Sequence, residues 1–164
     1  ETGSKVVFAA TGNKKRTLQK EKSEIHLPHS FENVQVAGPG ILAIKGKKFT
    51  SYDSAHNEMK QLSDALSTQD LTGFPIIVIG DDSAFIAKSL NNFLWVTFTR
   101  SNPSHDIYGV NSFTENKHWG CKGSLIIDAR IKPHHAPVLK KDVEIEKRID
   151  PLFQKGGSLE GVIK

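Results

Sequence analysis

The sequence predicts an α/β fold: a single domain in which a largely parallel or mixed twisted sheet carries helices packed on its faces. The first observation is the stretch from Phe74 to Ile79, a continuous apolar run rich in β-branched residues, which is typical of a strand covered on both faces. The second is that segments with helical periodicity alternate with strand-like segments, as in βαβ units. The third is the length of 164 residues, enough for one domain with a genuine hydrophobic core.

Five elements are predicted before the central strand at 74–79. They are a strand at 5–10, a basic surface loop at 11–24, a short strand within 30–36, a strand at 41–45 and a helix at about 54–67. The helix carries an apolar stripe with the spacing i, i+4, i+7 and i+11, formed by Ala55, Met59, Leu62 and Leu66. We expect this stripe to lie on the sheet, and we expect His56 and Glu58 to face water.

The central strand is followed by a second predicted βαβ unit. Gly80-Asp81-Asp82-Ser83 supplies a turn with helix N-cap residues, and a short helix with one apolar side follows it. Residues 93–100 alternate between two sets of side chains, and this pattern predicts a strand. The prediction is completed by a long loop at 101–122, a strand at 124–129 and an amphipathic element that begins near Asp142 and ends or bends at Asp150-Pro151.

Composition and charge argue against several classes of function. The net charge is +4, and the lysine clusters that carry the excess have no aromatic residues interleaved with them. A nucleic-acid surface needs such interleaving or a recognition helix, so we expect solvated lysines and no nucleic-acid partner, with a polyanion or partner surface as the alternative. No apolar run reaches the roughly 18 residues that a membrane span needs. The single cysteine, Cys121, cannot form an internal disulfide, which fits a reducing compartment such as the cytoplasm.

Acidic residues occupy the turn at which a nucleotide would otherwise bind. In a doubly wound sheet the ligand lies beyond the carboxyl ends of the strands, with its phosphate at a helix N-terminus. Asp81 and Asp82 place two carboxylates there, so the sequence argues against a nucleotide. We interpret both as helix-terminal charges, with a metal or polar-partner role as the alternative.

Histidine and cysteine spacing argues against a metal centre and a thiol nucleophile. His118-x2-Cys121 is one possible half-site, but the adjacent His134 and His135 lack the separation found in zinc fingers, and there is no second cysteine. Lys122 is placed to lower the pKa of Cys121, but the sequence assigns no base to the thiol. We therefore predict no catalytic, cofactor-binding or metal-binding residue in this chain.

Three charged residues are candidates for an ion pair that orders the long loop. Arg100 ends one predicted strand and Asp128 lies near the end of another, so the two could meet at one edge of the sheet. Asp106 is the alternative partner of Arg100. We favour a structural ion pair over direct contact with a substrate.

The loop between the predicted strands has an unusual aromatic content. It contains Tyr108, Phe113, His118 and Trp119, and long loops in compact domains are commonly functional. We expect these four residues to form an interface with a neighbouring domain or subunit.

Three segments carry a resemblance to a known family. They are Trp95-Val-Thr-Phe-Thr-Arg100-Ser-Asn-Pro103-Ser-His-Asp106, the preceding Gly80-Asp81-Asp82 and the later Ser124-Leu-Ile-Ile-Asp128-Ala-Arg130. The sequence resembles the C-terminal domain of UbiD-like decarboxylases, the 3-octaprenyl-4-hydroxybenzoate carboxy-lyase family. That domain has a tryptophan-containing strand ending in Thr-Arg, then a proline and an aspartate, and later an Ile-Asp-Ala-Thr-like strand. The resemblance spans residues 30–151.

The resemblance implies a function for the parent enzyme rather than for this chain alone. Such a parent removes carboxylate as carbon dioxide from an aromatic or α,β-unsaturated acid, using prenylated flavin mononucleotide with a divalent metal and potassium. This chain contains no segment that matches the flavin- and metal-binding region, so we expect it to bind no cofactor and to show no turnover alone. Its implied role is that of a structural and oligomerisation domain, with the remaining domains of the parent as partners in a homo-oligomer. The resemblance also implies that the loop with Tyr108, Phe113, His118 and Trp119 lies near the substrate side of the parent's active site. The alternative is a stand-alone α/β protein-interaction module without catalysis.

The expected domain boundaries follow from composition. Residues 1–4 are expected to be a remnant of expression cloning, and residues 5–155 to form the UbiD-like α/β domain. Residues 156–164, which begin with two glycines, are expected to form a flexible tail.

Overall fold

The computed structural model describes residue 7, residues 11–136 and residues 142–162. By its internal contacts the chain divides into two compact units, one up to Pro133 and one from His134. The predicted domain at 5–155 therefore spans both units. The predicted strand at 5–10 lies outside the described residues, apart from Val7.

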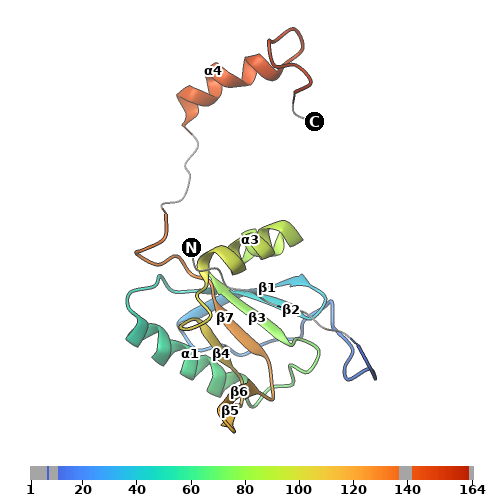
Figure 1. Ribbon diagram of the computed structural model, residues 1–164, viewed down its shortest axis with the longest axis vertical. Helices are drawn as coiled ribbons and strands as arrows, with labels where there is room; N and C mark the ends of the chain where they lie inside the picture. Colours follow the sequence, from blue (N-terminus) through green and yellow to red (C-terminus); the bar gives the residue numbers. More distant parts are fainter. Residues whose placement is uncertain (1–6, 8–10, 137–141, 163–164) are drawn as a thin grey trace. The chain divides into compact units, whose positions relative to one another are not determined.

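The first unit is built on a five-stranded mixed sheet with the strand order β1-β2-β3-β7-β4 (Figure 1). Its strands are β1 (Phe31–Gly38), β2 (Ile41–Gly46), β3 (Ile76–Gly80), β4 (Ile107–Gly109) and β7 (Leu125–Asp128). Strands β2, β3 and β7 run parallel, while β1 and β4 pair antiparallel at the two edges. The α/β class and the mixed sheet with helices are thus confirmed.

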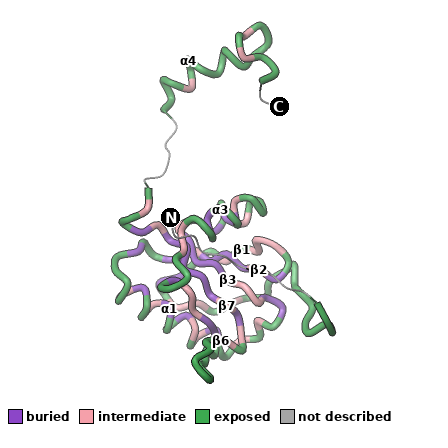
Figure 2. The backbone as a smooth tube through the Cα atoms, viewed as in Figure 1, coloured by how far each residue is buried: buried purple, intermediate pink, exposed green. Residues whose placement is uncertain are grey.

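Helices cover both faces of this sheet. α1 (Tyr52–Leu66) lies on one face, while α2 (Ser83–Ala87) and α3 (Leu90–Arg100) lie on the other (Figure 1). Because successive strand residues point to opposite faces, β3 places Ile77 and Ile79 in the core with α1 and Val78 in the core with α3. The central strands are accordingly buried along most of their length (Figure 2). The prediction of a strand covered on both faces is confirmed.

α1 forms where the sequence predicts a helix, because its N-terminus is capped and one stripe is apolar. The Ser51 hydroxyl oxygen accepts a hydrogen bond from the Ser54 N–H at 3.2 Å. The residues that α1 buries are Ala55, Met59, Leu62 and Leu66, the predicted stripe. Strand β2, α1 and β3 form the first predicted βαβ unit, with β2 and β3 parallel.

Residues 93–100 belong to a helix, so the predicted strand there is wrong. Ser89 caps α3 by accepting a hydrogen bond from the Asn92 N–H at 3.1 Å. The side chains that α3 buries are Phe93, Val96 and Thr97, at helical spacing. Large apolar residues stand on both sides of this helix, and they hide its period from a search for one apolar stripe. The second predicted βαβ unit is therefore wrong, and β3 pairs in parallel with β7.

The predicted loop at 101–122 contains three short strands. Besides β4, they are β5 (Ser112–Glu115) and β6 (His118–Cys121), which form a separate two-stranded hairpin. The turn residues Asn116 and Lys117 both have positive φ, 49° and 65°. Two positive φ angles in a two-residue connection are the backbone of a type I′ hairpin turn. The prediction missed this hairpin because the second turn residue is lysine, whereas glycine would have marked the turn.

The second unit contains α4 (Val143–Phe153), so the amphipathic element predicted to begin near Asp142 is a helix. The Asp142 carboxylate accepts hydrogen bonds from the N–H groups of Glu144 and Ile145 at 3.0 and 3.3 Å. The helix includes Pro151 and continues to Phe153, so the proline does not end it. None of the described helices has the length and apolar character that a bilayer crossing requires.

Candidate functional site: a buried ion-pair cluster and the adjoining groove

Charged side chains gather where the parallel strands end. Strands β2, β3 and β7 run in the same direction, so their carboxyl ends meet at one edge of the sheet. Four charged residues at this edge are at most 1% exposed: Asp106, Asp128, Arg130 and Lys132. Together with Glu58 from α1 they are called the ion-pair cluster below.

Arg130 is held by a two-pronged contact with Asp128. Its Nε and Nη2 donate hydrogen bonds to the two carboxylate oxygens of Asp128 at 2.9 and 2.7 Å. Its Nη1 donates to Glu58 Oε2 at 2.6 Å and to the carbonyl oxygen of Lys47 at 2.9 Å. Burial by itself opposes the charge of the guanidinium, but these two carboxylates outweigh it and raise the pKa of Arg130. Arg130 therefore joins β7 to α1 and to the segment after β2.

Lys132 joins the segment after β7 to the loop that precedes β4. Its Nζ lies 3.2 Å from Asp106 Oδ1. It also donates hydrogen bonds to the carbonyl oxygens of Asp128, Arg130 and Arg100 at 2.9, 3.3 and 3.1 Å. The Phe49 ring centroid lies 5.5 Å from this ammonium and 5.8 Å from the Arg130 guanidinium carbon. The aromatic face of Phe49 therefore stabilises both buried cations.

The three predicted ion-pair residues lie at this end of the sheet, but they do not pair with one another as expected. The partner of Arg100 is Asp81, with Nη1 and Oδ2 3.6 Å apart. Asp106 pairs with Lys132, and Asp128 pairs with Arg130. The expectation that Arg100 pairs with Asp128 or Asp106 is corrected accordingly, because α3 ends on the side of Asp81.

The sequence-based prediction missed the two cations at the centre of the cluster. The apolar run at 125–127 is followed by charged residues at every second position, namely Asp128, Arg130 and Lys132. In an extended chain this spacing places their three side chains on the same side of the backbone. That spacing predicts that the three charged side chains lie close together. Glu58 was expected to face water, but it is half-buried against Arg130, with its side chain 18% exposed. No local pattern marks this contact, because it joins residues 72 positions apart.

The two aspartates after β3 have separate tasks. Asp82 caps α2 by accepting a hydrogen bond from the Phe85 N–H at 3.0 Å, which confirms its assignment as a helix-terminal charge. Asp81 accepts a hydrogen bond from the Ile131 N–H at 2.8 Å and pairs with Arg100. Asp81 thus connects the end of β3 to the segment after β7.

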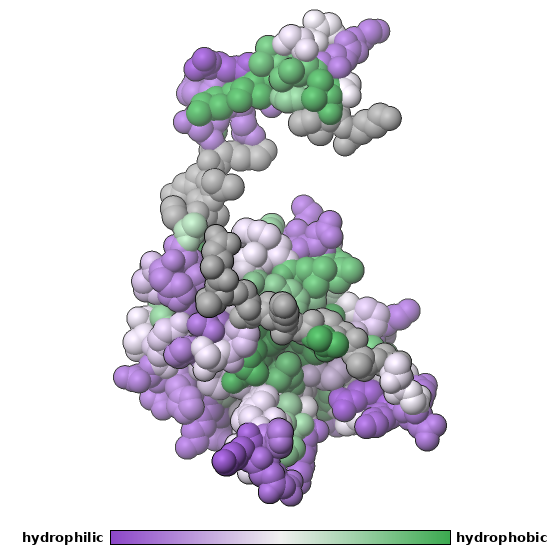
Figure 3. Space-filling model, viewed as in Figure 1, coloured by the Kyte–Doolittle hydropathy of each residue, from purple (hydrophilic) through white to green (hydrophobic). Residues whose placement is uncertain are grey.

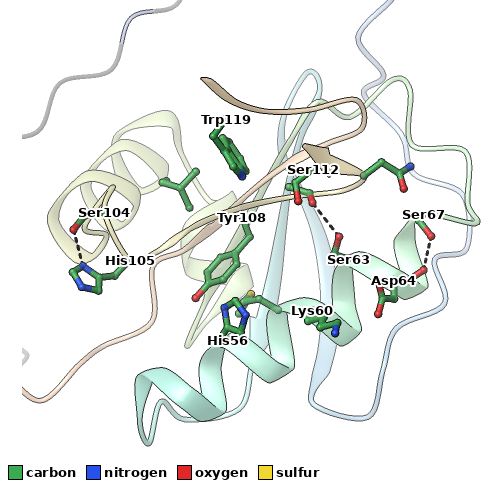
Figure 4. Close-up of a pocket in the computed structure, with 14 residues that line it drawn as sticks. His56, Lys60, Ser63, Asp64, Ser67, Ser104, His105, Tyr108, Ser112 and Trp119 are labelled. Atoms are coloured by element: carbon green, nitrogen blue, oxygen red, sulfur yellow. Dashed lines mark hydrogen bonds between the residues drawn. The ribbon is translucent and has the colours of Figure 1, made fainter. Parts of the chain in front are cut away.

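A groove of about 630 Å³ adjoins the cluster between α1, β4 and the β5–β6 hairpin (Figure 4). Its polar lining includes His56, Lys60 and Ser63 from α1, Tyr108 from β4 and Trp119 from the hairpin. The Ser63 hydroxyl donates a hydrogen bond to the Gly109 carbonyl oxygen at 3.0 Å and joins the two walls. The rings of His56 and Tyr108 lie next to each other in the groove, tilted by 49° with centroids 5.9 Å apart (Figure 4).

The cluster influences the groove through its charge. Burial, followed by the negative charges of Asp128 and Asp106, raises the pKa of Tyr108 to about 12. Burial and then the charge of Asp106 also raise the pKa of Tyr52. The Tyr52 ring packs on His105, another groove residue, with centroids 5.2 Å apart. Both hydroxyls are therefore neutral hydrogen-bonding groups at neutral pH rather than general bases.

We expect both tyrosines of the chain to ionise above pH 10, with Tyr108 near pH 12. Because the folded state holds the proton of Tyr108 more tightly, its contribution to stability is present below the unfolded pKa of about 10 and is lost as the pH rises to 12. The ultraviolet absorbance of tyrosinate, followed during an alkaline titration, measures this. Tyr108→Phe should remove the later step and Tyr52→Phe should keep it. Two midpoints near pH 10 would contradict the expected shift.

Of the four residues predicted to form an interface from the aromatic loop, two line the groove and two do not. Tyr108 and Trp119 line the groove. Phe113 and His118 lie on β5 and β6 and are not among the lining residues. The Phe113 ring covers Gly120, where an added Cβ would lie 2.7 Å from the ring. All four thus belong to short strands, and their contact with a neighbouring domain or a substrate stays a prediction.

The thiol of Cys121 is poorly suited to nucleophilic catalysis. Burial raises its pKa, against a smaller opposite effect of Arg16, so the thiolate is disfavoured. Within the part of the chain that the structure describes, no three histidine, cysteine or acidic side chains are grouped so that they could hold a metal ion.

The residues at the carboxyl end of the sheet do not fit the phosphate of flavin mononucleotide. A phosphate site needs free cations or unsatisfied N–H groups. In the cluster, Arg130 and Lys132 already contact carboxylates, and the Asp82 side chain occupies the N-terminus of α2. The chemistry of this donor set is that of an internal ion-pair network.

No protein-family model matches the chain. It is 26% identical over 153 residues to an uncharacterized protein of Chlamydia muridarum (strain MoPn / Nigg), covering 93% of this chain and 25% of the relative. It is 23% identical over 147 residues to a Chlamydia pneumoniae protein described as a subunit of 4-hydroxybenzoate decarboxylase, covering 90% of this chain and 24% of the relative.

Among solved structures, the chain is similar to the vanillic acid decarboxylase of Sedimentibacter hydroxybenzoicus in its open form. The match covers 70% of this chain and 27% of that chain, with 18% identity and a TM-score of 0.41. The chain is thus similar over nine tenths of its length to a protein described as part of a decarboxylase, and it spans about a quarter of the length of the relatives it matches.

Proposed function

We propose that this chain is the C-terminal structural and oligomerisation domain of a UbiD-like non-oxidative decarboxylase. The parent enzyme would act on an aromatic or α,β-unsaturated carboxylic acid in the cytoplasm, with prenylated flavin mononucleotide, a divalent metal and potassium bound by its other domains. The observation that carries the proposal is the 23% identity over 147 residues with the Chlamydia pneumoniae protein described as a subunit of 4-hydroxybenzoate decarboxylase.

The chemistry of the ion-pair cluster supports a structural role for this chain. Its cations contact carboxylates of the same chain, so they are not available to bind the carboxylate of a substrate. Arg130 and Lys132 connect β7 to α1, to the segment after β2 and to the loop before β4. A framework of this kind holds the groove and its lining residue Tyr108 in fixed positions beside the other domains of the parent.

The second candidate is a stand-alone α/β interaction module without catalysis. It is favoured by the large apolar side chains that the first unit exposes, among them Trp95 and Trp119. The two candidates differ in whether the native reading frame continues into a flavin-binding region.

The test compares this chain with the longer native polypeptide that the proposal requires. Each is produced with a source of prenylated flavin, and carbon dioxide release from 4-hydroxybenzoate and the flavin absorbance of the purified protein are measured. We expect release and bound flavin from the longer polypeptide, and neither from this chain. A native reading frame confined to this chain would support the interaction module. Flavin bound by this chain alone, with turnover, would overturn the structural role.

A further inference from the structure

We propose that the outward side of α2 and α3 is the surface on which the remainder of the longer decarboxylase chain docks. This surface, called the α3 outer face, consists of Phe85, Leu90, Leu94, Trp95 and Phe98. The inference rests on the proposed function, and it names the contact through which this domain is held to its parent.

α3 is apolar on both sides, which is the sequence character of a helix covered on both sides. Its inner side buries Phe93 and Val96 against the sheet. The five side chains of the outer face are nevertheless 38–62% exposed. Hydrophobic side chains accordingly gather over α3 in the space-filling view (Figure 3). Phe93 and Val96 hold α3 on the sheet, and none of the five outer side chains belongs to the buried core of the described residues.

The exposed apolar area is comparable to the largest apolar patch of a typical monomer. A half-exposed aromatic side chain leaves on the order of 100 Å² in contact with water, so these five residues expose on the order of 450 Å² of apolar surface. The largest apolar patch of a typical monomer is of about this size and is often functional.

Contacts within α2 and α3 hold the residues of the α3 outer face together. The Asn92 side-chain amide donates a hydrogen bond to the Phe85 carbonyl oxygen at 2.8 Å and joins α2 to α3. The Phe85 and Trp95 rings meet edge to face, with centroids 6.4 Å apart. The Arg100 guanidinium carbon lies 4.9 Å from the centroid of the Trp95 ring. A preformed aromatic surface loses little entropy on binding.

The size of the face favours the rest of the same chain over a second copy. An obligate homodimer buries about 2,000 Å² or more in total, which exceeds what this face and a matching copy would supply. Interfaces between domains of one chain range from about 600 to 1,500 Å², and covalent linkage gives the partner a millimolar effective concentration. The relatives are about four times as long as this chain, since it spans 24–25% of them, so the remaining three quarters can supply such a partner.

The test places charges on the face in the longer native polypeptide. Leu90→Asp with Leu94→Asp adds two carboxylates one helical turn apart, and Leu90 is the first residue of α3, where an acidic residue is favourable. We expect the melting midpoint of this chain alone to be unchanged. In the longer polypeptide we expect protease cleavage between this domain and the remainder to be about tenfold faster. The matched control is Asn57→Asp with Gln61→Asp, the same spacing on the exposed side of α1, which should change neither.

Two outcomes would decide against the inference. Cleavage no faster than in the control would overturn it. If the two substitutions lower the number of subunits that sedimentation measures for the longer polypeptide, and leave its cleavage rate unchanged, the face binds a second copy instead. The activity of the unsubstituted longer polypeptide is measured separately. If it releases no carbon dioxide but the substitutions still accelerate cleavage, the proposed decarboxylase function fails and the docking surface stands.

Discussion

Replacing Arg130 with methionine is expected to lower the free energy of unfolding of the first unit by about 3–5 kcal/mol. The guanidinium is fully buried, and its removal leaves the equally buried Asp128 carboxylate without its two charge-assisted hydrogen bonds. It also frees Glu58 and the Lys47 carbonyl oxygen. Most of this loss of stability comes from leaving the buried Asp128 carboxylate without a cation. The net contribution of the intact ion pair to the stability of the native protein is smaller.

Urea denaturation followed by circular dichroism measures this effect. The control is Lys45→Met, which removes a cation from the exposed pair with Glu32 and should leave the urea midpoint unchanged. The double variant Arg130→Met with Asp128→Leu replaces both charges with apolar groups and should recover most of the loss. If Arg130→Met alone unfolds at the native midpoint, the cluster does not hold this unit together.

Replacing Lys132 with methionine is expected to lower the free energy of unfolding by about 3 kcal/mol. Lys132 and Asp106 are each 1% exposed, and the Lys132 ammonium lies 3.2 Å from Asp106 Oδ1. Asp106 would keep its hydrogen bond from the Asn102 N–H, at 2.6 Å, which limits the loss. Three carbonyl oxygens would also lose a donor.

This variant has a local readout that Arg130→Met lacks. Lys132 ties the end of α3 to the segment that leads into β4, so limited proteolysis should cut residues 101–106 faster in Lys132→Met than in the native chain. The control is Lys147→Met, which removes a cation from an exposed pair with Glu144 on α4. In this control, residues 101–106 should be cleaved at the native rate. Native protection of 101–106 in Lys132→Met would show that Asp106 is held by its backbone contacts alone.

The elements that the sequence predicted correctly are those with an uninterrupted local pattern. The apolar run at 74–79 and the stripe from Ala55 to Leu66 each describe what one element buries, and burial in the sheet follows directly from that pattern. The segment at 93–100 defeated the same reasoning. Its outer side is as apolar as its inner side, so its alternation is compatible with a strand as well as with a helix.

The candidate site was less accessible to sequence reasoning than the fold. Arg100, Asp106 and Asp128 were identified as charged residues near strand ends, and all three lie at the carboxyl end of the sheet. Their partners were not identified, because a charge in the sequence does not reveal which opposite charge the fold brings within hydrogen-bonding distance. The aromatic loop was likewise recognised by composition, but its division into β4 and a hairpin depended on pairings with β7 and on two positive φ angles.

The sequence by itself determined the α/β class, the strand buried on both faces, the helix that follows β2 and the acidic cap after β3, because each depends on side chains within a few positions of one another. Only the tertiary structure decided that 93–100 is a helix, that Arg130 and Lys132 are buried and paired, and that five apolar side chains of α2 and α3 are exposed. These outcomes depend on contacts between distant parts of the chain, such as Arg130 with Glu58, and the low dielectric of the interior makes those contacts strong only after the sheet has formed.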